Sequence, residues 1–226
     1  MSEKKSKFNW NDPLFLTSQL SEEEKIIQDQ AQKFCTNELL PRITKANRSE
    51  TFDREVYFLL GENGLLGSTI DGYGCAGINH IGYGLIAREI ERVDSAYRSL
   101  MSVQSSLVMF PIDEYGSDEQ KSEFLPELAK GKLIGCFGLT EPDFGSDPGG
   151  MKTFAKKVDG GYILNGSKSW ITNSPVADIM IVWAKTTDEH LKGFILTRKM
   201  DGIMTPKIEG KFSLRASATG QILMQD

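Results

Sequence analysis

Residues 135–148 read GCFGLTEPDFGSDP, and residues 165–173 read NGSKSWITN. The first stretch is crowded with small residues, hydroxyls and turn formers, and it follows a short apolar run that begins at Leu133. The second stretch carries Trp170 two residues before Thr172. Because successive side chains of a strand alternate between its faces, this spacing puts the indole and the hydroxyl on one face. The two stretches together predict a segment that can hold a flat heteroaromatic group.

A flavin is such a group, since it needs an aromatic side chain on its ring face and a hydroxyl near a ring nitrogen. Gly138, Gly145 and Ser146 would let a ligand approach the backbone of the first stretch closely. Successive N–H groups in a loop of this kind form a concavity suited to a pyrophosphate. A surface cluster of turns is the open alternative for the loop, and Trp170 alone is typical of a core residue. Its combination with Thr172 favours the ligand site.

The composition argues against several classes of protein. The 226 residues carry a formal net charge of -5, which disfavours nucleic acid as a partner. No apolar stretch approaches the ~20 residues that span a bilayer. Residues 1–10 are polar and poor in arginine, unlike a secretory signal or an organelle transit peptide. We therefore expect a cytoplasmic, bacterial protein.

Cysteine and histidine usage argues against a disulfide framework and against a metal site. Cys35, Cys75 and Cys136 are odd in number and widely separated, so we expect free, buried thiols. Neither His80 nor His190 has a second histidine or a cysteine at ligand spacing. We predict no metal. With only two histidines, the sequence also gives little support to a Ser-His-Asp hydrolase.

The first half of the chain predicts helices that pack as a bundle. Ser21 and Ser117 each begin a capping box. Pro41 and Pro111 are each expected to end a helix, because proline lacks the N–H that the helix interior needs. The expected helices run from residue 21 to Pro41, over 52–60, over 81–93, over 97–110 and onward from 117. Their short connections predict close neighbours.

From Gly131 onward, short alternating runs predict strands. These runs lie at residues 133–137, 153–158, 162–164, 178–184, 193–197 and 220–224. Asp159-Gly160-Gly161 and Asn165-Gly166 predict hairpin turns. The order indicates an α+β fold, with an N-terminal helical bundle domain over 1–130 and a β-rich, barrel-like domain over 131–226. The last run begins a strand with no turn and no partner after it, so we expect a truncated chain.

Residues 72–77 read GYGCAG and satisfy the G-x-G-x-x-G pattern of dinucleotide-binding turns. That pattern has its meaning only where it follows a strand and opens a helix. Here a helical segment precedes it, and three residues separate it from the next helix. We predict an ordinary loop between helices.

The two opening motifs resemble the flavin-binding pair of the acyl-CoA dehydrogenase family: FGLTEP at 137–142 with GSD at 145–147, and WITN at 170–173. Three other stretches look like the glutaryl-CoA dehydrogenases in particular, namely ERVDSAYRS at 91–99, MSVQSS at 101–106 and GKFSLRASATG at 210–220. The resemblance covers nearly the whole chain. It implies a helical domain, a middle β domain and a C-terminal four-helix bundle. We expect the bundle, with the family's catalytic glutamate, to be absent from this chain.

The resemblance implies FAD as the cofactor. It puts the backbone of residues 137–140 and the Thr140 hydroxyl at the pyrimidine edge of the flavin, Trp170 over one ring face and Thr172 near N5. Ser146 would lie near the pyrophosphate or the CoA arm. The implied cofactor-binding residues are Phe137, Gly138, Leu139, Thr140, Gly145, Ser146, Trp170, Ile171 and Thr172.

Arg98 is the residue that the resemblance assigns to substrate choice. Its guanidinium matches a carboxylate bidentately, and Ser99 can add a hydroxyl donor. Ser146 is a further implied substrate contact. A helix-surface arginine is the alternative for Arg98. Arg215 is expected to pack against the protein rather than to contact a phosphate.

The implied reaction is the oxidative decarboxylation of glutaryl-CoA to crotonyl-CoA. A base removes the α-proton, the flavin accepts the β-hydride, and an electron-transfer flavoprotein receives the electrons. The family also implies a homo-oligomer, a tetramer. Because the base is expected outside this chain, no catalytic residue is assigned within it. The alternatives are a non-catalytic folded remnant and a dehydrogenase of uncharged acyl chains, which Arg98 disfavours.

Overall fold

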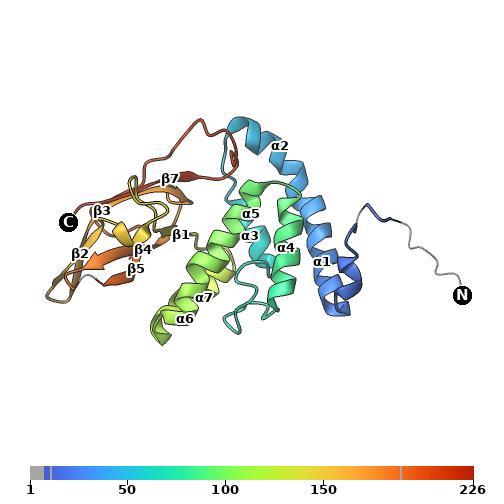
Figure 1. The fold of residues 1–226 in the computed structure, drawn as a ribbon, viewed down its shortest axis with the longest axis horizontal. Coiled ribbons are helices and arrows are strands. Elements are labelled where there is room, and N and C mark those ends of the chain that lie inside the picture. Colours follow the sequence, from blue (N-terminus) through green and yellow to red (C-terminus); the bar gives the residue numbers. More distant parts are fainter. Residues whose placement is uncertain (1–7, 11, 189) are drawn as a thin grey trace, which may run out of the picture.

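The structure, a computed structural model, describes residues 8–10, 12–188 and 190–226. Helices come first and strands second, as the sequence predicts. Figure 1 shows the sheet at one end of the molecule, beside the long helix that runs from α5 to α6, and α1 toward the other end. The α-helices are α1 (Glu22–Phe34), α2 (Leu40–Ser49), α3 (Glu55–Glu62), α4 (His80–Glu91), α5 (Ser95–Ser102), α6 (Phe110–Tyr115) and α7 (Asp118–Ala129). Residues 1–7 lie outside the described residues. They are the greater part of the segment 1–10, for which we predicted neither a secretory signal nor a transit peptide.

Both predicted capping boxes are present. The Ser21 hydroxyl accepts from the Glu24 N–H at 3.2 Å, and the Glu24 carboxylate accepts from the Ser21 N–H at 2.8 Å. Ser117 and Gln120 make the same reciprocal pair at the start of α7. These bonds satisfy N–H groups that a helix start would otherwise leave without acceptors, so the sequence alone marks where both helices begin.

The expectation that Pro41 and Pro111 end helices is wrong. A π-helical turn, η2 (Cys35–Leu39), joins α1 to α2, and another, η3 (Val103–Met109), joins α5 to α6. In each turn the chain shifts to i→i−5 bonds: Leu40 N–H donates to Cys35, and Phe110 N–H donates to Ser105. Each proline then stands at the first turn of the following helix, where its missing N–H is not needed.

Seven strands form one curled sheet. They are β1 (Gly135–Gly138), β2 (Phe154–Val158), β3 (Gly161–Thr172), β4 (Ile179–Thr186), β5 (Leu191–Thr197), β6 (Ile203–Met204) and β7 (Thr219–Met224). The order is β1-β4-β2-β3-β7-β6, with β5 pairing on β4. The predicted turn at residues 159–161 is confirmed, since Val158 pairs with Gly161 across the β2–β3 hairpin. The predicted final strand is β7, and it lies between β3 and β6, which precede it in the chain.

The predicted turn at Asn165-Gly166 is wrong, because both residues lie inside β3. Asn165 pairs with Phe154 of β2, whereas Gly166 pairs with Met224 of β7. The strand therefore changes partners at this dipeptide. Gly166 has φ 149°, and a Cβ there would stand 2.5 Å from the Thr153 hydroxyl. Glycine is needed for a bend against Thr153, not for a reversal of the chain.

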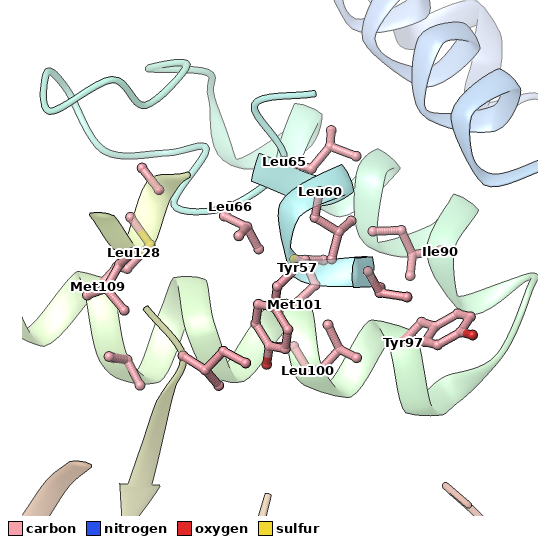
Figure 2. Packing of buried hydrophobic residues seen from close by; sticks show 14 of the residues in the cluster. Tyr57, Leu60, Leu65, Leu66, Ile90, Tyr97, Leu100, Met101, Met109 and Leu128 are labelled. Atoms are coloured by element: carbon pink, nitrogen blue, oxygen red, sulfur yellow. The ribbon is translucent and has the colours of Figure 1, made fainter. Parts of the chain in front are cut away.

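The main core lies among the helices and reaches the sheet. Figure 2 shows Tyr57 and Leu60 of α3 packed beside Leu100 and Met101 of the α5 helix. β4 is buried on both faces: Ile179 and Ile181 join the helical core, whereas Met180 and Val182 join a smaller core with Cys136 and Ile222. The apolar run of β4 therefore binds the helical part and the sheet into one body.

Gln104 of η3 fixes where the sheet begins relative to the helices. This fully buried side chain accepts from the Gly135 N–H at 2.9 Å and donates to the Leu133 carbonyl at 2.8 Å. Gly135 also allows a close approach, because a Cβ there would stand 2.4 Å from Val108. The entry of the chain into the candidate ligand loop is thus anchored on the long helix.

The remaining predictions on loops and thiols are also decided by the structure. Residues 72–77 form a loop between α3 and α4, as predicted. All three cysteines are free; Cys35 and Cys136 are buried, and Cys75 is half-buried. No helix within the described ranges is long and apolar enough to cross a membrane. The same part of the chain holds no cluster of His, Cys, Asp and Glu suited to a metal ion.

Candidate functional site

Trp170 stands on an irregular stretch of β3. The pairing of β3 with β7 shifts register between Lys168 and Ile171, and Trp170 has φ 60°, in the left-handed region. A bulky residue there costs of order ~1–3 kcal/mol and persists only where the surroundings enforce it. The indole is 64% exposed, whereas Ile171 next to it is buried. The strain therefore presents an aromatic face to the outside of the sheet.

Three hydroxyl groups of the two motifs have no hydrogen-bond partner within the described part of the chain. Thr172 follows Trp170 on β3, whereas Thr140 and Ser146 lie in the loop after β1. Within the described residues, none of these three hydroxyls makes a hydrogen bond. Thr140 and Thr172 are half-buried and Ser146 is exposed. These groups can donate to or accept from a ligand without breaking any bond of the fold.

The loop and the strand are joined directly. The Ser169 N–H donates to the Thr140 carbonyl at 2.9 Å, and the Lys168 ammonium donates to the Leu139 carbonyl at 3.0 Å. Behind the loop, the Phe137 ring meets the Trp183 indole edge-on, with 6.2 Å between centroids. The structure thus brings together the two motifs that the sequence separates by about two dozen residues.

A buried ion pair lies under this junction. The Lys168 ammonium is 3.0 Å from Glu141, and both side chains are buried. Burial raises the pKa of Glu141, but hydrogen bonds from Thr153, Lys152 and Lys168 outweigh it and bring the pKa to about 2. Burial lowers the pKa of Lys168, and Glu141 opposes that shift. Each group therefore favours the charged form of the other.

The glycines of the first motif differ in what requires them. A Cβ on Gly138 would stand 3.0 Å from Ile222 and 3.3 Å from the Lys168 stem, so the missing side chain makes room for the sheet interior. The role of Gly138 toward a ligand stays a prediction. A Cβ on Gly145 would meet nothing within 4 Å. Gly145 therefore lies beside open space, where a ligand has access to the backbone.

Arg98 lies on α5 and is already paired. Its Nε donates to Glu91 at 2.7 Å, and its Nη1 donates to Ser102 at 3.3 Å. The Arg98 side chain is 38% exposed. Ser99 is half-buried, and its hydroxyl makes no hydrogen bond within the described part of the chain. Arg98 precedes Gln104 by six residues on one continuous helix, roughly 9 Å along its axis.

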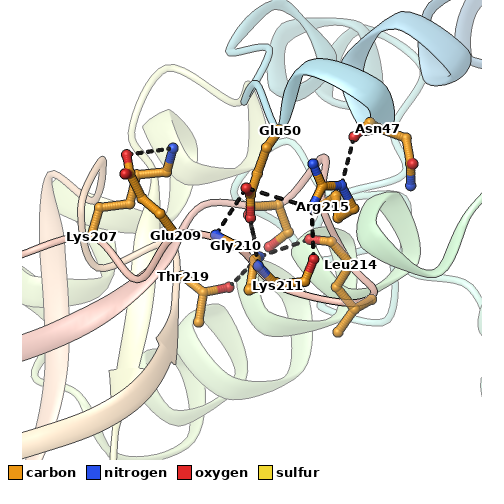
Figure 3. A network of polar contacts seen from close by, with 10 residues as sticks. Asn47, Glu50, Lys207, Glu209, Gly210, Lys211, Leu214, Arg215 and Thr219 are labelled. Carbon is orange, nitrogen blue, oxygen red and sulfur yellow. Dashed lines mark hydrogen bonds and ion pairs between the residues drawn. The ribbon is translucent and has the colours of Figure 1, made fainter.

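Arg215 belongs to a structural network beside the start of β7. Figure 3 shows it between the end of α2 and the segment that leads to β7. Its Nε donates to the Asn47 carbonyl at 3.0 Å and its Nη1 to the Lys211 carbonyl at 2.8 Å. Glu50 accepts from the N–H groups of Gly210 and Lys211, each at 3.0 Å. The expectation that Arg215 packs rather than meets a phosphate agrees with these contacts.

Two open hollows lie away from Trp170, Thr140 and Thr172. A groove of about 580 Å³ lies among α1, α3 and α4, with Phe34 and Leu59 in its lining. A hollow of about 380 Å³ lies between α6 and the β4–β5 hairpin, next to Trp183. Neither is lined by Trp170, Thr140 or Thr172. The exposed Trp170 indole and the open space beside Gly145 mark the candidate ligand site instead.

Sequence reasoning missed the residues that organise the site from within. The burial of Lys168 has no signal in the alternation of β3, since lysine is typical of exposed strand positions. Gln104 likewise reads as an ordinary helix residue. The one available signal for Glu141 was its place between Thr140 and Pro142, in a loop otherwise rich in small residues.

Comparison with known proteins decides the family. Residues 21–132 match the model described as "Acyl-CoA dehydrogenase, N-terminal domain", and residues 136–226 match "Acyl-CoA dehydrogenase, middle domain". The chain belongs to the acyl-CoA dehydrogenase family. The family is one of FAD-dependent oxidoreductases. The predicted resemblance and the predicted fold, helices followed by a curled half-barrel, are both confirmed.

This acyl-CoA dehydrogenase chain is similar to members with different substrates. It is 45% identical to a glutaryl-CoA dehydrogenase from Mycobacterium smegmatis in complex with FADH2, with a TM-score of 0.92 over 95% of this chain and 55% of that one. It is 32% identical to a short-chain specific acyl-CoA dehydrogenase of Clostridium acetobutylicum, covering 92% of this chain and 56% of the relative. It is 35% identical to a mitochondrial isovaleryl-CoA dehydrogenase of Pongo abelii, and the match covers 92% of this chain and 51% of the relative. The chain spans about half the length of the curated relatives it matches.

Proposed function

We propose that this chain provides the FAD site and the acyl-group specificity of a glutaryl-CoA dehydrogenase. The observation that carries the proposal is the exposed indole of Trp170, held on strained backbone beside a loop with unpaired hydroxyls. A largely exposed side chain on strained backbone gains little from packing within the chain, which supports a role toward a ligand. The 45% identity to the Mycobacterium smegmatis enzyme supports glutaryl-CoA as the substrate.

The residues of the two motifs fit the isoalloxazine ring of FAD. Trp170 offers a flat apolar face, and Thr172 follows it with a free hydroxyl. The backbone of residues 137–140 and the Thr140 hydroxyl would hold the pyrimidine edge, and the open backbone around Ser146 would face the pyrophosphate or the CoA arm. When bound, FAD supplies the acceptor for the hydride that leaves the β-carbon of the acyl group.

Arg98 is proposed to bind the far carboxylate of the substrate, with Ser99 as a second donor. Glu91 accepts from Nε and the Ser102 hydroxyl accepts from Nη1, so Nη2 is the donor that stays available among the described residues. A planar guanidinium fixed at one edge presents its other donors in a set direction, which favours a carboxylate over a methyl group. In this arrangement Glu91 orients Arg98, and Arg98 selects the acyl chain.

The base that takes the α-proton is proposed to lie outside residues 1–226. Glu141 is committed to Lys168 in the interior, and Asp143 is exposed and lies 3.9 Å from Lys152. The buried Glu141 is not free to approach an α-carbon, and Asp143 lies in the loop that is proposed to flank the cofactor rather than to face the substrate. Dye-coupled oxidation of glutaryl-CoA by residues 1–226 with added FAD should give no turnover. A protein that adds the remaining length of the relatives should be active, and equal rates would contradict the proposal.

Titration of FAD with the chain tests the cofactor site. We expect saturable quenching of flavin fluorescence, and Trp170→Ala should weaken binding by about tenfold or more. Trp10→Ala is the matched control, since that indole is 87% exposed and lies in the N-terminal segment. Equal binding by the wild type and Trp170→Ala would remove Trp170 from the site. No binding by a folded chain would refute the proposed function.

A dehydrogenase of uncharged acyl chains is the second candidate, favoured by the short-chain and isovaleryl relatives. In the FAD-loaded protein, glutaryl-CoA and butyryl-CoA should perturb the flavin spectrum at different concentrations. Tighter binding of glutaryl-CoA supports the first proposal, and tighter binding of butyryl-CoA supports the second. A folded chain that never takes up FAD would support a non-catalytic remnant.

For the active enzyme we propose an electron-transfer flavoprotein as electron acceptor and a homo-oligomer as the assembly.

A further inference from the structure

Lys168 has its ammonium group fully enclosed and fully used. Its exposed fraction is 0%. The ammonium donates to the Leu139 carbonyl at 3.0 Å and to Glu141 at 3.0 Å, and the Met151 sulfur lies at 3.7 Å. An ammonium has three donors, so this set leaves none without a partner.

Glu141 is satisfied to the same degree. One oxygen accepts from the Lys152 N–H at 2.7 Å, and the other accepts from the Thr153 N–H at 2.8 Å as well as from Lys168. The pair therefore connects three segments: the loop after β1, the residues before β2, and the middle of β3. We name Lys168 and Glu141 together the brace.

Stability alone gives no reason for the brace. Taking two charges out of water offsets most of their attraction, and apolar side chains of similar volume often serve as well. A fully bonded buried pair does, however, fix directions, because each hydrogen bond is lost when a segment shifts by about an ångström. Its effect is to be found in the geometry that it fixes.

That geometry is the bulge of β3. The register shift begins at Lys168 itself, and Trp170 follows two residues later with its left-handed φ. Between them, the Ser169 N–H binds the Thr140 carbonyl at 2.9 Å. The brace thus holds β3 to the loop at the start of the register shift, two residues before the exposed indole.

We propose that Lys168 and Glu141 are positioning residues that hold Trp170 and the Thr140 segment in the arrangement that receives the flavin. They act from the buried side and do not touch the cofactor. This inference rests on the proposed function for its ligand, whereas its structural part, control of the Trp170 conformation, concerns the chain alone.

Four proteins test the proposal: the wild type, Lys168→Met, Glu141→Gln and the double variant Lys168→Met with Glu141→Gln. The double variant removes both charges, so no buried charge is left uncompensated and its Tm should lie above that of either single variant. Amide hydrogen exchange at residues 169–172 should still be about tenfold faster than in the wild type. The double variant should bind FAD at least about tenfold more weakly than the wild type does.

Arg42→Met is the control for general destabilisation. Arg42 pairs with Asp53 at 3.0 Å among the helices, away from β3. This variant should lower Tm without changing exchange at residues 169–172 or FAD affinity. A purely structural role for the brace predicts that exchange and affinity follow Tm in all variants alike.

The proposal is overturned if a folded double variant keeps wild-type exchange at residues 169–172. It is also overturned if the double variant binds FAD as tightly as the wild type does. Should the wild type itself fail to bind FAD, the proposed function fails, and the exchange measurement then decides alone whether the brace controls Trp170. If none of the variants folds, amide hydrogen exchange of the wild type is measured at rising pH and rising urea concentration. Residues 169–172 should then open together with residues 139–141. Independent opening of the two segments would overturn the proposal.

Discussion

The guanidinium of Arg98 has its Nε edge bound to Glu91, and its Nη1 also donates to Ser102. In the described residues its Nη2 has no partner. A carboxylate that approaches this edge meets a donor whose direction is already set by the rest of the group. The specificity of the site thus depends on Glu91 together with Arg98, because the Glu91 carboxylate orients the arginine toward the carboxylate of the substrate.

Arg98→Gln should lower kcat/KM for glutaryl-CoA by roughly 10- to 100-fold, because a hydrogen bond to a charged group contributes about 1.5–3 kcal/mol. The rate with butyryl-CoA should change little. The measurement needs the longer, active protein with FAD, and Arg48→Gln, an exposed arginine of α2, is the control. Equal losses on the two substrates would show that Arg98 is structural.

Glu141 should give the fold a distinct response to acid. Its pKa falls from 4.5 to about 2, so it stabilises the folded chain above pH 4.5, and this contribution is lost as the pH drops toward 2. In Glu141→Gln, the free energy of unfolding should be lower at pH 7 and should decline less over that interval. Urea denaturation at a series of pH values measures both. The exposed Glu123→Gln should keep the wild-type profile, and parallel profiles for Glu141→Gln and wild type would contradict the assignment.

Individual elements show which signals the sequence carries and which it does not. The capping boxes at Ser21 and Ser117 are local, so they predict helix starts correctly. Pro41 and Pro111 misled because the π-helical turns before them depend on tertiary packing. The two ligand motifs could be found from residue types alone, but their union through a buried lysine could not. The division of the chain at residue 130 stays a prediction.

Within β3, Gly166 is a position where one added methyl group should lower the stability of the fold. Gly166→Ala would combine a φ of 149° with a clash at 2.5 Å against Thr153, and it should destabilise the fold by more than about 1 kcal/mol. Gly161→Ala on the same strand is the matched control, since its Cβ would meet nothing within 4 Å and the change should lie within ~0.5 kcal/mol. Chemical denaturation of both variants gives the comparison. A tolerated Gly166→Ala would mean that β3 does not bend against Thr153.

Gln104 and Glu50 are two of the contacts that hold the sheet on the helices. Gln104 ties the start of β1 to η3, and Glu50 at the end of α2 binds the segment that leads to β7 (Figure 3). β1 leads into the ligand loop, and β7 pairs with the half of β3 that carries Trp170 and Thr172. The helical part therefore positions both sides of the candidate site through distant contacts.

Glu50→Ala should loosen the second of these contacts. The N–H groups of Gly210 and Lys211 would lose their acceptor, so their amide exchange should quicken and Tm should fall. Glu209→Ala is the control, because Glu209 is exposed and lies 3.6 Å from Lys207 only. Unchanged exchange at both amides in Glu50→Ala would show that α2 does not hold this segment.

We propose that FAD lies against Trp170, and the fluorescence emission of single indoles can distinguish this position from any other. The chain has three tryptophans, so Trp10→Phe with Trp183→Phe leaves Trp170 as the sole emitter, and Trp10→Phe with Trp170→Phe leaves Trp183. Addition of FAD should strongly quench the emission of Trp170 and affect that of Trp183 much less, because a stacked flavin accepts excitation from the indole it covers. Unchanged Trp170 emission while flavin fluorescence still reports binding would put the cofactor elsewhere and contradict the account.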